Sequence, residues 1–151
     1  MATSVQIVFD CADPERLGRF WSQALDYKEQ DPPPGFATWP EALKSFRVPE
    51  ADWNSAYAIV DPEKKGPRIY FQQMDTPKLG KNRLHIDLNV GGGPSVRLEE
   101  RRKRIDAEVE RLLKIGATKF NVVELPWRSA AETGEYWVVL QDPDENEFCV
   151  Q

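Results

Sequence analysis

The sequence predicts an α+β fold in which two tandem βαβββ modules form a cupped mixed sheet with the helices on its outer face. Three observations lead to this prediction. The ending DPDENEFCVQ (residues 142–151) has a looser echo, VDPEKKGPRIYFQ, at residues 60–72. The same order of strand, helix and further strands precedes both copies. Finally, a chain of 151 residues with 40% apolar and 30% charged residues can bury a core without disulfides or metal.

The first module is expected at about residues 1–76 and begins with a strand. VQIVFDC (residues 5–11) alternates and is rich in β-branched residues, which is typical of a strand. Asp13 then suits a helix N-cap and Pro14 the first helical position. Apolar residues recur at helical spacing after them: Leu17, Phe20, Trp21, Ala24 and Leu25. AYAIV (56–60) and PRIYFQQM (67–74) are further strands, separated by the turn DPEKKG.

The second module, at about residues 82–151, repeats this order. RLHIDLNV (83–90) alternates like a strand, and a long helix is expected from about Pro94 to Gly116, a typical residue after a helix end. TKFNVV (118–123), EYWVVLQ (135–141) and the final segment supply the remaining strands. The residues that this helix is expected to bury are Leu98, Ile105, Val109, Leu112 and Leu113. The chain is therefore expected to form a single domain, residues 1–151, built of two modules.

Alternation along the strands predicts two different faces of the sheet. Gln6–Asp10 align with His85–Asn89, and Ile69–Gln72 with Phe148–Gln151. One face is apolar and can pack on the helices: Val5, Ile7, Phe9, Ile69, Phe71, Leu84, Ile86, Leu88, Phe148 and Val150. The other is mainly polar: Gln6, Val8, Asp10, Arg68, Tyr70, Gln72, His85, Asp87, Asn89, Glu147 and Cys149. A sheet with one covered face and one polar face can form a cup that holds a ligand.

Charge and composition argue against several classes of partner. The net charge of −5 disfavours nucleic acid, and the basic run at residues 101–104 is interpreted as a solvated helix face because Glu99 and Glu100 lie one turn ahead of it. We find no apolar run long enough for a membrane span and no secretory-signal pattern in MATSVQIVFD. With only Cys11 and Cys149 and no CxxC spacing, a reducing cytoplasm is the simpler expectation. The sequence also lacks a P-loop, a dinucleotide fingerprint and a GxSxG motif.

A long connection at about residues 30–56 separates the first helix from the strands that follow it. It contains Trp39, Phe46 and Trp53, and it favours a short helix beginning at Pro40. Long connections in compact domains often serve as lids or binding loops. Alternatively, its aromatic residues cover the edge of the sheet, and the sequence leaves both interpretations open.

Three segments resemble a known family: IVFDCADPERLGRFWSQAL, GKNRLHIDLNV and WVVLQDPDENEFCV. They are similar to the glyoxalase-like branch of the vicinal oxygen chelate superfamily, which includes glyoxalase I, bleomycin-resistance proteins, extradiol dioxygenases and methylmalonyl-CoA epimerase. The resemblance covers most of the chain outside about residues 30–56 and 91–104. It implies paired βαβββ modules and, in the metalloenzymes, a divalent ion held by four side chains on the floor of the cup.

Carried over by position, those four places fall on Gln6, Tyr70, His85 and Cys149. The metalloenzymes usually have His or Glu there, whereas His85 is the only histidine of this chain. Gln and neutral Tyr oxygens are weak ligands, so we expect no cofactor and no tightly held metal. A divalent metal remains possible, with carboxylates nearby on Asp10, Asp87 and Glu147.

The resemblance and the polar face together leave two classes of function. The first is a binder of a small metabolite or drug-like ligand, as in the bleomycin-resistance relatives. The residues expected to bind it are Gln6, Asp10, Arg68, Tyr70, Gln72, His85, Cys149, Trp39 and Trp53. The second is a lyase, isomerase or dioxygenase acting on a small oxygenated substrate, either metal-dependent or with His85 and a carboxylate of Asp87 or Glu147 as acid and base. Cys149 is expected to be a pocket-wall residue rather than a nucleophile, and exposed sheet edges favour a homodimer.

Overall fold

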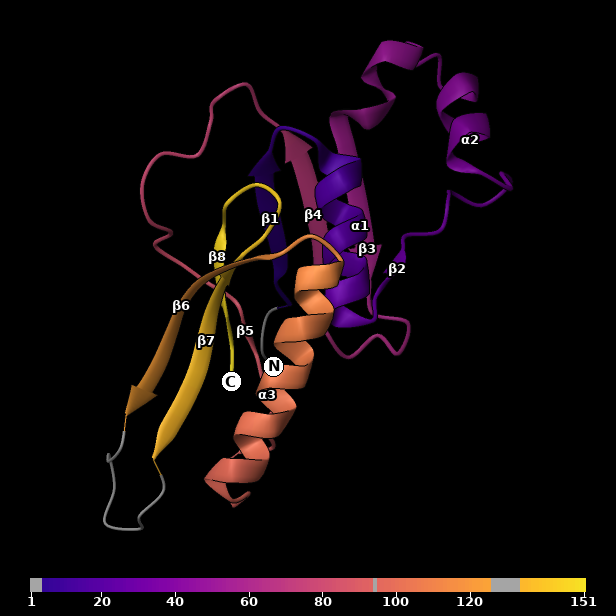
Figure 1. Ribbon diagram of the computed structural model, residues 1–151. Coiled ribbons are helices and arrows are strands. Elements are labelled where there is room, and N and C mark those ends of the chain that lie inside the picture. Colours follow the sequence, from indigo (N-terminus) through magenta and orange to yellow (C-terminus); the bar gives the residue numbers. More distant parts are fainter. Residues whose placement is uncertain (1–3, 94, 126–133) are drawn as a thin grey trace. The chain divides into compact units, whose positions relative to one another are not determined.

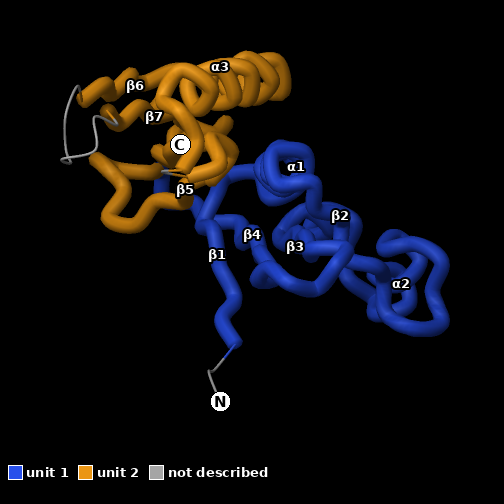
Figure 2. Tube along the Cα trace, turned by 90° about the horizontal axis from the view of Figure 1, so that it is seen from below, with its two compact units in different colours: residues 1–77 blue, residues 78–151 orange. Residues whose placement is uncertain are grey.

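The computed structural model describes residues 4–93, 95–125 and 134–151. The chain divides into two compact units, residues 1–77 and 78–151, here called module one and module two (Figure 2). Each holds one four-stranded sheet with the same strand order, β1-β4-β3-β2 in module one and β5-β8-β7-β6 in module two. In both sheets the first strand pairs in parallel with the last, and the other pairings are antiparallel. The prediction of two tandem βαβββ modules is confirmed.

Module one contains seven elements, which Figure 1 labels except for the 3₁₀ helix η1. They are β1 (Gln6–Cys11), α1 (Pro14–Leu25), β2 (Lys28–Glu29), α2 (Trp39–Ser45), η1 (Glu50–Ser55), β3 (Ala56–Val60) and β4 (Arg68–Gln73). Helix α1 begins as the sequence predicts, because the Asp13 carboxylate accepts the backbone N–H of Arg16 at 3.1 Å and Pro14 follows the cap. It ends at Asp26, which adopts a left-handed conformation with φ 54°.

The core of module one lies between α1 and the sheet, where α1 contacts β3 and β4. Leu17, Phe20 and Trp21 are fully buried on the inner side of the helix. The Phe9 ring lies 5.4 Å from both the Trp21 ring and the Phe71 ring, measured between centroids. Val5 does not join this apolar face: it precedes β1 and is 73% exposed, so its predicted burial is wrong.

The long connection of module one folds against itself through its aromatic residues. The predicted short helix is present as α2, which begins at Trp39, one residue ahead of Pro40, after an N-cap at Thr38. The Trp39 indole N–H donates to the carbonyl of Gln30 at 2.7 Å, and that of Trp53 donates to the carbonyl of Val48 at 3.1 Å. These bonds satisfy both indoles within the module.

Module two contains β5 (Asp87–Leu88), α3 (Leu98–Lys114), β6 (Thr118–Leu125), β7 (Glu135–Gln141) and β8 (Glu147–Val150). Strand β5 is much shorter than the predicted strand at residues 83–90. Backbone hydrogen bonds still extend its pairing with the C-terminal strand from Ile86, which accepts from Cys149 N–H at 3.0 Å, to Val90, which donates to the carbonyl of Gln151 at 2.8 Å. Leu84 lies before this ladder and is 75% exposed, so its predicted place on the apolar face is wrong.

Helix α3 packs on β7 and β8 through one apolar side. Ile105, Val109 and Leu112 are buried as predicted, whereas Leu113 is 38% exposed. The reason is geometric: each helical residue turns the side chain by about 100°, so Leu113 points away from the sheet that its neighbour Leu112 faces. The helix begins at Leu98, which is only partly buried. The start expected at about Pro94 lies outside the described residues.

The basic run of α3 is used inside module two. Arg101 donates to the carbonyl of Gly134 at 2.8 Å, the Arg102 guanidinium lies 4.7 Å from the centre of the Tyr136 ring, and Arg104 donates to Glu100 at 3.0 Å. These contacts agree with the interpretation of the run as a helix surface. No helix in the described parts of the chain has the length and apolar character needed to cross a bilayer.

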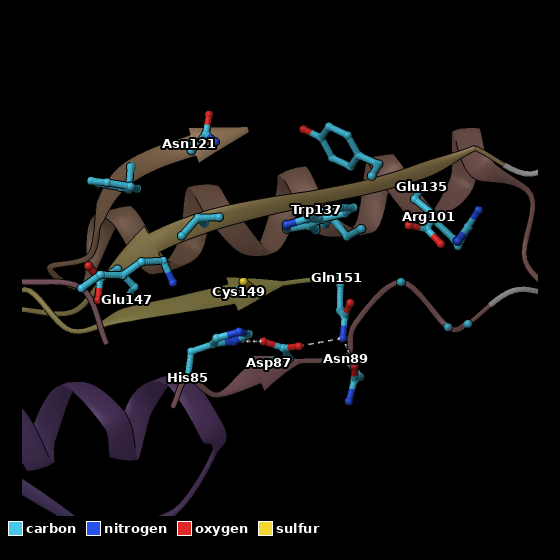
Figure 3. A pocket seen from close by; sticks show the side chains of 18 residues that line it. His85, Asp87, Asn89, Arg101, Asn121, Glu135, Trp137, Glu147, Cys149 and Gln151 are labelled. Atoms are coloured by element: carbon cyan, nitrogen blue, oxygen red, sulfur yellow. Dashed lines mark hydrogen bonds and ion pairs between the residues drawn. The ribbon is translucent and has the colours of Figure 1, made fainter. Parts of the chain in front are cut away.

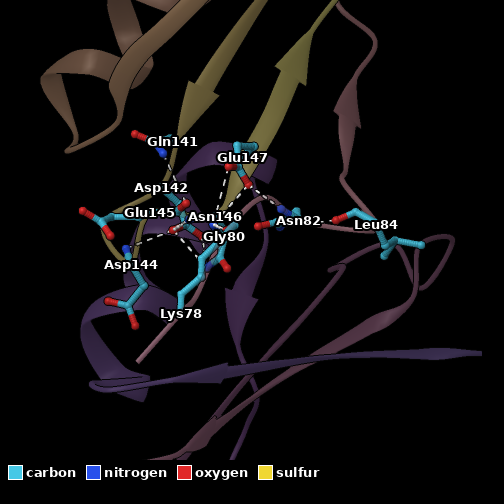
Figure 4. A network of polar contacts seen from close by, with 10 residues as sticks. All are labelled: Lys78, Gly80, Asn82, Leu84, Gln141, Asp142, Asp144, Glu145, Asn146 and Glu147. Carbon is cyan, nitrogen blue, oxygen red and sulfur yellow. Dashed lines mark hydrogen bonds and ion pairs between the residues drawn. The ribbon is translucent and has the colours of Figure 1, made fainter. Parts of the chain in front are cut away.

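The repeated ending of the sequence builds the same kind of turn in both modules. Asp61, between β3 and β4, accepts the backbone N–H groups two and five residues further on, both at 2.8 Å. Asp142, between β7 and β8, accepts those two and four residues further on, both at 2.9 Å (Figure 4). Each carboxylate thus closes the turn that leads into the last strand of its sheet.

Candidate functional site

A pocket of about 890 Å³ lies in module two, and all of its lining residues belong to that module (Figure 3). Alternate residues of β5, β7 and β8 form much of the wall: Asp87, Glu135, Trp137, Val139, Glu147 and Cys149. Successive strand residues point to opposite faces, so these alternate with the core residues Val138, Leu140, Phe148 and Val150. The volume lies within the range of sites for small organic molecules.

His85 and Asp87 form a hydrogen-bonded pair on the pocket wall. His85 Nδ1 lies 2.7 Å from Asp87 Oδ1. An ionised carboxylate only accepts hydrogen bonds, so Nδ1 carries the hydrogen and donates it. Nε2 is then the unprotonated nitrogen of the neutral ring, which can accept a hydrogen bond or a proton from a ligand.

The second oxygen of Asp87 continues this polar row. The Gln151 side-chain amide donates to Asp87 Oδ2 at 3.2 Å and to Asn89 Oδ1 at 3.0 Å. Figure 3 shows the four side chains in sequence along the edge of the pocket, from His85 through Asp87 and Gln151 to Asn89. Because each member fixes its neighbour, the row presents a set of donors and acceptors in fixed positions.

Cys149 lies beside this row, on β8 opposite Asp87 in the parallel ladder. Its side chain is only 9% exposed. Burial, together with the charge of the Asp87 carboxylate and a hydrogen bond to it, raises the pKa of the Cys149 thiol to about 11. The group is therefore a neutral thiol near pH 7, which favours the expected pocket-wall role over that of a nucleophile.

Glu147 lines the pocket but is held by the segment before β5 (Figure 4). The Asn82 backbone N–H donates to Glu147 Oε2 at 2.9 Å, and the Lys78 ammonium lies 3.3 Å from the same oxygen. Burial opposes ionisation of Glu147, but these hydrogen bonds outweigh it and lower the pKa of its carboxyl. Both contacts make Glu147 a weaker candidate for the general base than His85, and they identify it as an anchor for residues 78–82.

The predicted site residues of module one share the polar face of its own sheet. The parallel register of β1 and β4 places Gln6 beside Arg68 and Asp10 beside Gln72, with Tyr70 beside Val8 in the row between them. Arg68 donates from Nε to Gln30 Oε1 and from its terminal nitrogen to Gln6 Oε1, both at 2.6 Å. Its guanidinium carbon lies 5.1 Å from the centre of the Tyr70 ring.

The predicted ligand-binding residues of module one do not line the module-two pocket; these are Gln6, Asp10, Arg68, Tyr70, Gln72, Trp39 and Trp53. Conversely, sequence reasoning missed Trp137 and Gln151, which do line it. Their signal was available: period-two alternation in EYWVVLQ puts Trp137 on one face with Glu135 and Val139. The same alternation continues from Cys149 to Gln151.

The four metal positions implied by the family resemblance do not fit a metal ion in this chain. In module one the Gln6 carbonyl oxygen accepts from Arg68, and the same guanidinium lies over the Tyr70 ring. The Arg68 guanidinium, a fixed cation, therefore lies beside Gln6 and Tyr70, the two side chains that a divalent ion would need as ligands. In module two a different set is possible, because ligand atoms of His85, Asp87 and Cys149 all lie within 4.8 Å of one another.

The strand order, repeated in both sheets, places the chain in the class of folds built from paired βαβββ modules. Within that class, the sequence profile described as "Glyoxalase-like domain" matches residues 6–151, so the chain belongs to the glyoxalase-like domain family. No curated protein sequence matches the chain.

Solved structures share the fold at low sequence identity. One is a variant of the fosfomycin resistance protein FosX from Listeria monocytogenes, complexed with Mn(II) and 1S,2S-dihydroxypropylphosphonic acid, with 14% identity, a TM-score of 0.59, and coverage of 100% of this chain and 92% of that one. Another is a glyoxalase/bleomycin resistance protein/dioxygenase family enzyme from Burkholderia phytofirmans PsJN, with 17% identity, a TM-score of 0.53 and coverage of 97% and 94%. A glyoxylase/bleomycin resistance protein/dioxygenase domain from Frankia sp. EAN1pec has 17% identity, a TM-score of 0.56 and coverage of 99% and 96%.

Proposed function

We propose that this glyoxalase-like protein binds a small oxygenated metabolite or drug-like molecule in the module-two pocket, without a tightly held metal. The observation that supports this most is the hydrogen-bonded row from His85 to Asn89 along a pocket of about 890 Å³. A few polar groups in fixed positions on a partly apolar wall are typical of small-molecule sites.

The chemistry of the wall favours a ligand with hydroxyl or carbonyl groups. His85 Nε2 can accept from a hydroxyl group, while Asn121 and the Lys81 ammonium, which also line the pocket, can donate to a carbonyl. Trp137 and Phe120 add aromatic surface on which the carbon skeleton can pack. The ligand of the FosX variant, a dihydroxypropylphosphonic acid, is a small oxygenated compound of this general kind.

Binding requires only the pocket, whereas turnover requires proton transfer as well. His85 is the residue best placed for it, because Asp87 orients the imidazole through Nδ1 and would stabilise the imidazolium that forms when Nε2 takes a proton. Asp87 then acts through His85 as a positioning residue. Catalysis by His85 would follow binding and requires a substrate whose proton Nε2 can reach.

A metal-dependent lyase, isomerase or dioxygenase is the second candidate. It is favoured by the cluster of His85, Asp87 and Cys149, whose nitrogen, oxygen and sulfur ligands would suit a borderline metal such as zinc. A metal bound there would supply Lewis acidity. It ranks second because Cys149 binds metal as a thiolate, and its pKa of about 11 opposes that form.

We also infer a reducing, cytoplasmic setting for the chain. Cys11 and Cys149 are both buried and neither forms a disulfide. Cytosolic proteins usually keep their thiols in this state.

The proposed function is tested by a thermal-shift screen of small hydroxy and keto acids, sugars and amphipathic drugs. A bound compound should raise the melting temperature of the wild type, because binding to the native state alone stabilises it. We expect His85→Ala to lose that shift while its stability falls by only ~1 kcal/mol, the usual effect of one lost hydrogen bond. Trp137→Ala should weaken binding, and Arg83→Ala is the matched control because Arg83 is exposed and does not line the pocket. A compound that stabilises wild type and His85→Ala equally would contradict the proposed site.

A further inference from the structure

Arg68 of module one is held by neutral groups alone. It donates to the amide oxygens of Gln6 and Gln30, each at 2.6 Å, and its guanidinium lies over the Tyr70 ring. Among the described residues no carboxylate forms an ion pair with it. Arginine side chains that are partly buried are usually paired with an acid, and Arg68 is partly buried. Its positive charge therefore has no carboxylate partner in the part of module one that the structure describes.

The position of Arg68 is informative because of what surrounds it. Gln6 and Tyr70 occupy the two module-one places where metalloenzymes of this fold are expected to hold their ion. A guanidinium stays protonated at any physiological pH, so it is a permanent cation at these places. It would repel a dication, and it already uses the Gln6 oxygen that a dication would need.

We propose that Arg68 forms a binding site for an anionic oxygen group, a carboxylate, phosphate or phosphonate, on the polar face of module one. The two bonds to Gln6 and Gln30 fix the plane of the guanidinium, and three of its five N–H groups remain for a ligand. A fork fixed in this way can bind two oxygens of an anion side by side. This inference goes beyond the proposed function, because it adds an anion site on the polar face of module one and does not depend on the pocket of module two.

A purely structural role for Arg68 makes a different prediction. As a crosslink between Gln6 and Gln30, Arg68 would affect stability but not the affinity for anions. The two roles are separated by measuring anion binding and unfolding on the same variants.

The experiment titrates the full-length protein with inorganic phosphate and with acetate at constant ionic strength, followed by nuclear magnetic resonance. We expect phosphate to shift the Arg68 Nε–H signal of the wild type. Arg68→Gln should weaken phosphate binding at least tenfold, whereas Arg68→Lys, which keeps the charge but loses the fork, should weaken it less. Arg47→Gln is the control, since it removes the same charge from an exposed side chain of module one. In the converse titration, Arg68→Gln should bind Mn²⁺ more tightly than the wild type.

Equal phosphate affinity in wild type and Arg68→Gln, or a wild-type Arg68 Nε–H signal that phosphate leaves unchanged, would overturn the proposal. The second measurement needs no variant, so a failure of Arg68→Gln to fold does not affect it. Either result leaves the ligand screen with His85→Ala unaffected. Failure of the anion site and failure of the proposed function are therefore distinguishable.

Discussion

Asp87 organises the polar row of module two because its two carboxylate oxygens hold two different side chains, His85 and Gln151. The equivalent position in module one is Val8. The parallel registers demonstrate this equivalence: Asp87 lies opposite Cys149, and Val8 lies opposite Tyr70. Module one has Gln6 at the place of His85, so the histidine of this row belongs to module two, where Asp87 is the carboxylate that holds it.

Asp13 provides a test of capping and its pH dependence at the scale of one residue. Hydrogen bonds from the Asn54 side chain and the Arg16 backbone N–H hold the pKa of the Asp13 carboxyl below its usual value of 3.8. A carboxyl with a lowered folded pKa stabilises the fold above its unfolded pKa, and this contribution is lost as the pH falls through the folded value. We expect Asp13→Ala to cost about 0.5–2 kcal/mol at pH 7.

As the pH falls below 3.8 and through the lowered pKa of Asp13, the difference between Asp13→Ala and wild type should shrink. Urea unfolding at several pH values measures it. Asp75→Ala is the control, because Asp75 is exposed and makes no hydrogen bond or ion pair within the described residues. A cost for Asp13→Ala that stays constant from pH 7 to pH 2.5 would show that the ionised carboxylate is not what stabilises the helix start.

Strand periodicity predicted which candidate side chains share one face of the sheet. His85, Asp87 and Cys149 come together on one wall as alternation requires. The anchoring of Glu147 was not predictable, because it depends on Lys78 and Asn82, which reach it through tertiary folding. The contacts of Arg68 were not predictable either, because its partner Gln30 lies 38 residues away in the sequence.

At the scale of elements, prediction succeeded where local signals agreed. Helix α1 has an N-cap, a proline at the first position and an apolar stripe, and its start was predicted to the residue. Strand β2 was missed because Lys28–Glu29 has two residues of low strand propensity and exists only through pairing with β3. The length of strand β5 was overestimated, because the alternation of residues 83–90 continues beyond the residues that pair with β8.

Gly18 tests how closely α1 packs on the sheet. A Cβ atom at this position would lie 2.2 Å from Cδ1 of the Tyr57 ring on β3. Alanine favours a helix over glycine by about 1 kcal/mol, but overpacking of this kind costs about 1–3 kcal/mol. We therefore expect Gly18→Ala to be destabilising overall, as measured by denaturant unfolding.

The matching double variant identifies the cause of that loss. In a Tyr57→Ala background the clash is gone, so Gly18→Ala should become neutral or stabilising. If Gly18→Ala destabilises both backgrounds equally, the close approach of Tyr57 is not the reason for glycine at this position.

At the scale of the whole molecule we expect a homodimer. Leu79 and Leu84 of module two are 85% and 75% exposed, and β1 lies at the edge of its sheet. Exposed apolar side chains and open strand edges favour association. A two-fold dimer buries the side chains and covers the edges. Light scattering at micromolar concentration should give twice the chain mass of 17.3 kDa. Replacing both leucines with glutamate should shift the mass toward the monomer, and a monomeric wild type would contradict the expectation.

The metal content of the purified protein is the most decisive property of the whole molecule, because it separates the two candidate functions. A dication must be stabilised by charged or strongly donating ligands to compensate for its lost hydration. Gln6 and Tyr70 provide neutral oxygens next to the Arg68 cation, and Cys149 is a neutral thiol with a pKa of about 11. His85 and Asp87 are the strong ligands that remain, and they are hydrogen-bonded to each other.

We therefore expect elemental analysis of protein purified without chelator or metal-affinity tag to find far less than one equivalent of divalent metal per chain. His85→Ala serves as the matched sample, because a metal bound at the cluster of His85, Asp87 and Cys149 would be lost from it. About one equivalent of zinc, nickel, iron or manganese in the wild type, absent from His85→Ala, would place the metal-dependent function first. It would also mean that the metal lowers the pKa of the Cys149 thiol far enough to bind it as a thiolate, since a bound cation reverses the effect of burial and of Asp87.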